Sequence, residues 1–201
     1  MEMLITTPIH LPADGAFLPF EGFTHNPFIF IFICIFAGKY IMRAMRKAAR
    51  RQEEQWALEV FDRAPYVTVS MVRPDGTPYG LPLSVVRSDN RTFYFHCAAE
   101  GEKIDCLRSN PMVSLSAVSK CSPKYEAEKN NFTEQYHSAI AIGRAETVTD
   151  RAEKIEALRL ICERFLPRYM EHFDEAIARS LDRTTIIRIT LTEPAVGKLK
   201  E

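Results

Sequence analysis

The chain has 201 residues, which is enough for one domain of ordinary size and an appendage. Its 26 basic and 26 acidic residues balance, so no excess of positive charge indicates a nucleic-acid partner. Five cysteines without a Cys-x-x-Cys pair and five scattered histidines predict neither a disulfide framework nor a metal site, and they favour a reducing cytoplasm.

Residues 1–41 differ in character from everything after them. They contain no Lys or Arg before Lys39, and residues 28–36 consist of Phe and Ile around one Cys. This apolar run is about half the roughly 20 residues that a membrane-spanning helix needs. Acidic residues precede it, whereas a secretory signal carries a basic segment there.

Three hypotheses account for this leader. It is translated upstream sequence, with the physiological start at Met42 or Met45; or it contacts a membrane through residues 28–51; or it is an arm that covers a neighbour. We favour the first, because Phe and Ile have AT-rich codons that noncoding DNA would supply. The leader, 1–41, is therefore set apart from a single domain at 42–201.

From Met45 onward the pattern is regular. Apolar spacing predicts helices over residues 46–61, from 102 to an Asn-Pro stop at 110–111, from a Thr149 or Asp150 cap to 165, and over 168–179. β-branched and aromatic runs predict strands over residues 66–72, 79–86, 92–95, 112–117, 138–148 and 184–191. The polar stretch 120–135 is predicted as a loop. Hairpin-joined strands with added helices indicate an antiparallel barrel of the α+β class.

The most informative stretch is Thr92–Pro111, where a strand leads into a short helix. Small residues and Gly101 allow a sharp turn before the helix. The first turn of a helix offers unpaired N–H groups and a partial positive charge, and Lys103 adds a full charge there. This junction predicts a site for a phosphate-sized anion, with His96 at the end of the strand.

The order of several motifs carries a resemblance. These motifs are Asp75-Gly76, Gly80-Leu81-Pro82-Leu83-Ser84, Phe93-Tyr94-Phe95-His96, Gly101-x-Lys103, Asn110-Pro111, Tyr136-His137-Ser138 and Gly143-Arg144-Ala145-Glu146. The chain from about Arg46 to Lys198 resembles the FMN-binding split-barrel proteins related to pyridoxamine 5'-phosphate oxidase. It is most similar to the branch that contains nitroimidazole-resistance reductases.

The resemblance implies a split β-barrel with flanking helices, and a homodimer with FMN at the subunit interface. The positions that it assigns to the cofactor are Pro82, Leu83, Ser84, Phe95, His96, Lys103, His137 and Ser138. The first three would lie along the isoalloxazine ring, with Phe95 and His96 beside the flavin and Lys103 at its phosphate. Either His137 or Ser138 would reach the ring from the other side.

The activity that the resemblance implies is an FMN-dependent, nitroimidazole-reductase-like oxidoreductase. An external donor such as NAD(P)H would reduce the flavin, and electrons would pass to a small electron-poor acceptor. His96 is the expected catalytic residue, as a proton donor, because the ordinary histidine pKa lies near neutrality. The chain carries no Gly-x-Gly-x-x-Gly fingerprint of a tightly held nicotinamide cofactor.

Two departures from the family separate this chain from true pyridoxamine phosphate oxidases. The C-terminal residues lack the Arg-rich motif that holds pyridoxal, and residues 80–84 contain no Arg or Lys for the flavin phosphate. Phosphate binding would therefore depend on Lys103, with Arg144 or Arg108 as an additional contact. The alternatives are a non-catalytic flavin- or haem-binding protein, with His96 or His137 as axial ligand, a membrane-associated flavoprotein, and a barrel that uses a deazaflavin.

Overall fold

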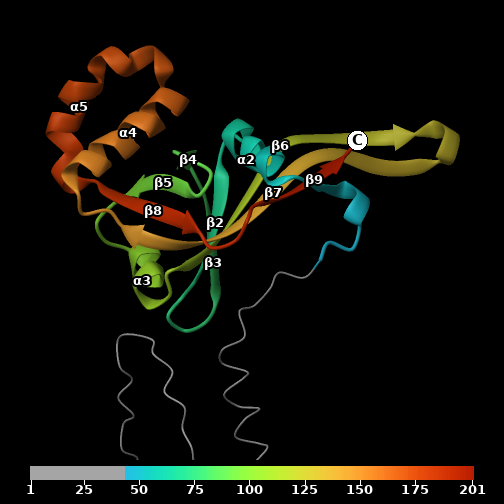
Figure 1. Cartoon of the computed structure of the whole chain (residues 1–201), viewed down its shortest axis with the longest axis horizontal. Coiled ribbons are helices and arrows are strands. Elements are labelled where there is room, and N and C mark those ends of the chain that lie inside the picture. The colour runs from blue at the N-terminus through green and yellow to red at the C-terminus, as the bar shows by residue number, and fades with distance from the viewer. Residues whose placement is uncertain (1–43) are drawn as a thin grey trace, which may run out of the picture. The chain divides into compact units, whose positions relative to one another are not determined.

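The computed structural model describes residues 44–201, so the hypotheses on the leader 1–41 concern a part of the chain outside it (Figure 1). The strands are β1 (Arg51–Gln52), β2 (Val67–Val72), β3 (Pro78–Leu83), β4 (Val86–Arg87), β5 (Thr92–Cys97), β6 (Met112–Glu126), β7 (Asn131–Thr147), β8 (Thr185–Leu191) and β9 (Val196–Lys200). The α-helices are α2 (Glu54–Arg63), α3 (Glu102–Ser109), α4 (Arg151–Phe165) and α5 (Phe173–Ser180). Short 3-10 turns are η1 (Ala48–Arg50), η2 (Ala127–Lys129), η3 (Pro167–His172) and η4 (Leu181–Arg183).

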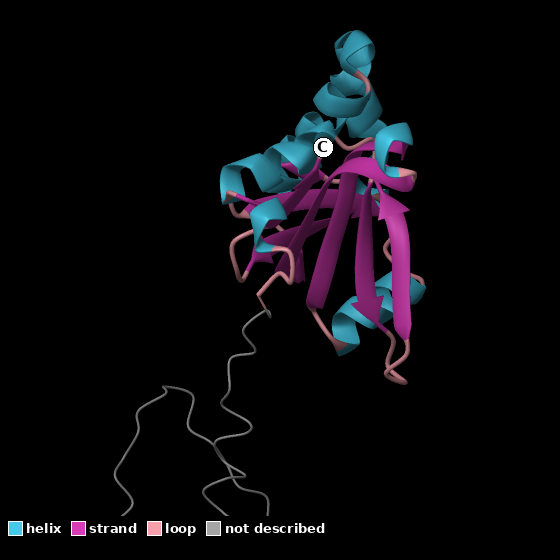
Figure 2. Cartoon of the chain, turned by 90° about the vertical axis from the view of Figure 1, so that its right-hand side faces the viewer, coloured by secondary structure: helices cyan, strands magenta, loops and turns pink. Residues whose placement is uncertain are grey.

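All strand pairs are antiparallel, and the main path of the sheet runs β3-β2-β6-β7-β8-β5-β4. The two ends of this path, β3 and β4, are joined by only Ser84 and Val85. Because so short a connection keeps the end strands together, the sheet must curl into a barrel. This confirms the predicted α+β split barrel with flanking helices. Figure 2 shows the curved sheet with helices at its ends.

The alternation along each strand separates the two faces of the sheet. In β2, Val67, Val69 and Met71 are buried inside the barrel, whereas the residues between them point outward. Inside, the rings of Phe61 and Phe93 meet edge to face with centroids 5.3 Å apart. A second apolar cluster lies where α4 and α5 cover the sheet, and it includes Ile186, Leu158 and Phe173.

Arg164 on α4 binds three backbone carbonyl oxygens, two at the end of α2 and one at the corner before β4. Its guanidinium donates hydrogen bonds to the carbonyl oxygens of Phe61 at 2.7 Å, Ala64 at 2.8 Å and Val85 at 2.7 Å. Half-burial lowers the pKa of Arg164, which nevertheless stays charged because an arginine pKa starts so high. One side chain thus fixes the end of α2 against the corner between β3 and β4.

Three expectations about local structure were wrong. The first helix begins at Glu54 and not at residue 46, because residues 48–52 form η1 and then β1, which pairs with β9. Residues 120–135 are not a loop; β6 and β7 continue through them as a projecting hairpin that we call the arm (Figure 1). The region predicted as a helix over residues 168–179 is split into η3 and α5.

A fourth expectation, one strand over residues 79–86, was also wrong, because the chain leaves β3 after Leu83 and β4 begins only at Val86. The remaining predicted elements are confirmed. Helix α4 begins after Asp150, whose Oδ1 accepts a hydrogen bond from the Glu153 amide at 2.8 Å. Helix α3 follows Gly101 and ends before Asn110-Pro111. Each helix in the part of the chain that the structure describes is too short or too polar to cross a membrane.

The barrel wall approaches itself closely at Gly143. A Cβ there would lie 2.6 Å from Ile189 Cγ2 and 2.9 Å from the Thr190 carbonyl oxygen. We therefore expect Gly143→Ala to lower the free energy of unfolding by about 1–3 kcal/mol, measured by urea denaturation, since the backbone oxygen cannot move aside cheaply. Gly80→Ala is the control, because its Cβ would meet nothing nearer than Ser70 Oγ at 3.4 Å. An equal loss of unfolding free energy in Gly143→Ala and Gly80→Ala would contradict the close approach of the barrel wall at Gly143.

Candidate functional site at the open seam of the barrel

The barrel is open along one line, which we call the seam. On one side, β3 pairs only with β2, so its other edge has no strand partner among residues 44–201. On the other side, β4 pairs with β5 only as far as Tyr94, which leaves residues 95–97 of β5 without a partner on that edge. Unpaired backbone groups therefore line both sides of the seam, and they are available to a ligand.

Three of the predicted residues meet at the end of β5. The Phe95 side chain is buried in the barrel core, and Lys103 Nζ lies over its ring at 5.5 Å from the centroid. His96, the next residue, is exposed on the opposite face of the strand. Part of the His96 ring is nevertheless desolvated by surrounding protein atoms, and this desolvation, followed by the charge of Lys103, lowers the pKa of His96 from its ordinary value of 6.5. The structure thus places Lys103 against Phe95, with His96 next to them on the other face of β5.

The N-terminus of α3 has the features of an anion site. Gly101 precedes it with φ of +114°, a conformation that favours glycine, and no side chain caps the helix. Arg73 lies at the same terminus, where it pairs with Glu102 and donates to the Pro78 carbonyl oxygen at 2.9 Å. Sequence reasoning missed Arg73, because it lies in a turn nearly 30 residues away along the chain.

Three further predicted residues lie beside the outer face of the sheet. One of them is Pro82 on β3. It stands in a cross-strand row that continues through Thr68 on β2 and Ser116 on β6 to Ile140 on β7, so these four residues share the outer face. Ser138, two residues before Ile140, points the same way, and Ser84 is exposed where β3 ends.

Leu83 and His137 belong to the inner side. Leu83 packs against the barrel core, and the His137 ring lies 5.4 Å from that of Trp56. His137 Nε2 also lies 3.2 Å from Glu201 Oε1. Of the two alternatives on β7, Ser138 is therefore the one that shares a face with Pro82.

The cysteines in this part of the chain are not activated nucleophiles. Burial raises the pKa of Cys97, and a hydrogen bond to Glu134 raises that of Cys121, so both thiols are protonated at neutral pH. Cys97 serves as a small residue at the end of β5. No group of three or more potential ligands for a metal ion occurs in residues 44–201.

Comparison with known proteins gives a consistent result. The family model described as pyridoxamine 5'-phosphate oxidase matches residues 53–197. A comparison with curated proteins found no match.

Several solved structures share the fold. A candidate 5-nitroimidazole antibiotic resistance protein from Bacteroides thetaiotaomicron VPI-5482 is 20% identical with a TM-score of 0.61, over 73% of this chain and 84% of that one. The flavocytochrome Anf3 from Azotobacter vinelandii is 20% identical with a TM-score of 0.68, over 79% and 73%. A FAD and heme binding protein from Mycobacterium smegmatis is 19% identical with a TM-score of 0.65, over 76% and 74%.

The proximity of Lys103 to His96 can be tested directly. Lys103→Met should raise the pKa of His96 in the ligand-free protein, because it removes the repulsion between two positive charges, while burial still holds that pKa below 6.5. An NMR titration of the His96 ring protons measures the shift. Arg108→Met, on the same helix but with a largely exposed side chain, should leave the His96 pKa unchanged. An unchanged His96 pKa in Lys103→Met would contradict the proximity of Lys103 to His96.

Proposed function

Because the chain belongs to the pyridoxamine 5'-phosphate oxidase family, we propose that it binds FMN along the seam and acts as a nitroimidazole-reductase-like oxidoreductase. The observation that carries this proposal is the uncapped N-terminus of α3 with Lys103 beside it, at the end of the seam. This arrangement suits a phosphate group, because the first backbone N–H groups of α3 have no side-chain cap and Lys103 belongs to the same helical turn. Similar folds described as a flavocytochrome and as a FAD and heme binding protein support flavin binding.

Lys103, Pro82 and Ser84 have direct roles in this proposal. The flavin, when bound, supplies the redox chemistry. Lys103 and the first amides of α3 bind its phosphate, and the free edge of β3 at Pro82 and Ser84 flanks its ring. With the flavin bound, an external donor such as NAD(P)H would supply the electrons and a small electron-poor molecule would accept them. Reaction in the cytoplasm is consistent with the unactivated thiols Cys97 and Cys121.

A homodimer fits the outer face of the sheet. Four apolar side chains lie there at least 36% exposed, namely Val72 (36%), Met112 (37%), Val118 (48%) and Ile140 (45%). Apolar residues grouped on one sheet face favour association with another surface. A second copy on this face would bring its own Ser138 toward the flavin, which is how the interface site of the proposal would be completed.

His96 is suited to hold a proton beside the flavin. Its lowered pKa means that the neutral imidazole predominates at pH 7, and that the imidazolium forms as the pH falls below 6.5. A neutral imidazole with one N–H can still donate that proton through a hydrogen bond. Proton donation to the reduced acceptor should therefore strengthen under mildly acidic conditions.

Binding of FMN tests the phosphate site. The full chain should turn yellow with FMN, bleach with a reductant and recover its colour with an acceptor. Lys103→Ala should lower FMN affinity by roughly ten- to a hundredfold, the equivalent of losing one charged hydrogen bond. Fluorescence titration measures the affinity, with Lys129→Ala on the arm as the control. Equal affinities in the two variants would place the phosphate elsewhere.

The pH dependence of turnover tests His96. We expect acceptor reduction by the FMN-loaded protein to accelerate as the pH falls from 7.5 to about 5.5, because the imidazolium population increases. His96→Gln should retain FMN, reduce the acceptor more slowly and lose this pH dependence. Stopped-flow reoxidation of the reduced flavin gives the rate. An identical profile in wild type and variant would assign His96 a structural role only.

A further inference from the structure

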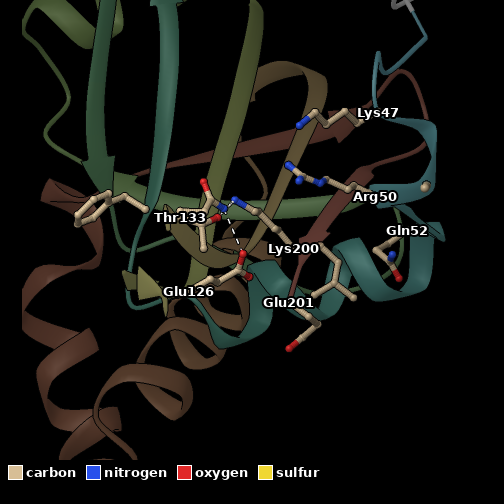
Figure 3. Close-up of a pocket in the computed structure, with 11 residues that line it drawn as sticks. Lys47, Arg50, Gln52, Glu126, Thr133, Lys200 and Glu201 are labelled. Carbon is tan, nitrogen blue, oxygen red and sulfur yellow. Dashed lines mark hydrogen bonds between the residues drawn. The ribbon is translucent and has the colours of Figure 1, made fainter. Parts of the chain in front are cut away.

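A second pocket lies away from the seam, between η1, the arm and the end of β9 (Figure 3). Its volume is about 640 Å³, within the range of small-molecule sites. Three cationic side chains line it, Lys47, Arg50 and Lys200. They come from segments at the two ends of the described chain, and their nitrogen atoms lie toward one another in Figure 3.

The three cations of this pocket outnumber its two carboxylates, Glu126 and Glu201, and none of the three forms an ion pair within residues 44–201. The ion pairs of this region join other residues, and none includes Lys47, Arg50 or Lys200. The two carboxylates leave the pocket with a small net positive side-chain charge, and a hydrogen bond from Asn131, helped by the charge of Lys200, lowers the pKa of Glu126. Glu126 Oε2 accepts a hydrogen bond from Asn131 Nδ2 at 3.1 Å, and Glu201 Oε1 lies 3.2 Å from His137 Nε2.

Neighbouring groups hold two of the three cations in place. Lys200 Nζ donates a hydrogen bond to Thr133 Oγ1 on the arm. Arg50 lies near the Tyr136 hydroxyl, and its charge contributes, after that of Lys198, to lowering the pKa of Tyr136. Lys198 Nζ in turn lies 5.2 Å from the centre of the Tyr136 ring. The positive field therefore extends along β9 and does not depend on one flexible side chain.

We propose that this pocket binds the phosphate groups of a phosphorylated small molecule. A phosphate carries two charges near neutral pH and several acceptor oxygens, so it can engage an arginine fork and two ammonium groups at once. A monocarboxylate would satisfy fewer of these donors. The proposal is independent of flavin binding, because none of its three cations borders the seam.

Calorimetric titration of the full chain with pyrophosphate, in a phosphate-free buffer, tests the pocket. Arg50→Gln and Lys200→Gln each remove one charge from it, and each should weaken binding by roughly tenfold or more. Lys120→Gln, on the arm but outside the pocket, should bind pyrophosphate as the wild type does. Lys103→Ala, at the seam, reports separately any pyrophosphate that binds at the proposed flavin-phosphate site. Circular dichroism melting curves confirm that each variant is folded.

The outcomes separate this pocket from the flavin site and from nonspecific attraction. Wild-type affinity in both Arg50→Gln and Lys200→Gln would overturn the proposal, as would an equal loss in Lys120→Gln. A loss confined to Lys103→Ala would place the anion at the seam, which also overturns it. Titration with ADP and with inorganic phosphate then identifies the source: tighter binding of ADP than of pyrophosphate assigns a nucleotide, and the reverse order assigns a free phosphate compound.

Discussion

The two-residue connection between β3 and β4 is the constraint on which the rest of this structure depends. It holds β3 and β4, the two end strands of the sheet path, close together, although these two strands form no pair with each other. Arg164 stabilises this corner by satisfying the Val85 carbonyl oxygen together with two at the end of α2. The seam therefore stays open and offers a candidate ligand site, while the hydrophobic core of the barrel remains intact.

Much of the barrel could be predicted from sequence, because its strands alternate cleanly and its helices have clear ends. Asp150 and the Asn110-Pro111 pair are local signals that act within a few residues. The arm could not be found in this way, because most of its residues are polar and none of residues 120–135 is buried, including the aromatic pair Tyr125 and Phe132. Strand β9 was missed for a related reason, since its five residues include Gly197 and two lysines.

The residues of the candidate site show the same difference between local and long-range signals. Lys103 and His96 are close in sequence, so their proximity followed from a strand, a turn and a helix. The shared face of Pro82 and Ser138 depends on registers across four strands, and sequence alone left His137 and Ser138 as equal alternatives. Arg73 and the cations of the second pocket come together only through tertiary structure. What sequence reasoning lacks, in each case, is the pairing of distant segments.

The arm has a consequence for how stability is distributed along the chain. The fourteen cross-strand pairs between β6 and β7 are interrupted by a register shift between Val118 and Lys120, with seven pairs on each side of it. Beyond that shift, backbone hydrogen bonds hold the hairpin together without a buried apolar side chain beneath them. Segments of this kind open locally at a small fraction of the free energy that global unfolding requires. Amide protons of the arm would thus exchange with solvent while the barrel remains folded.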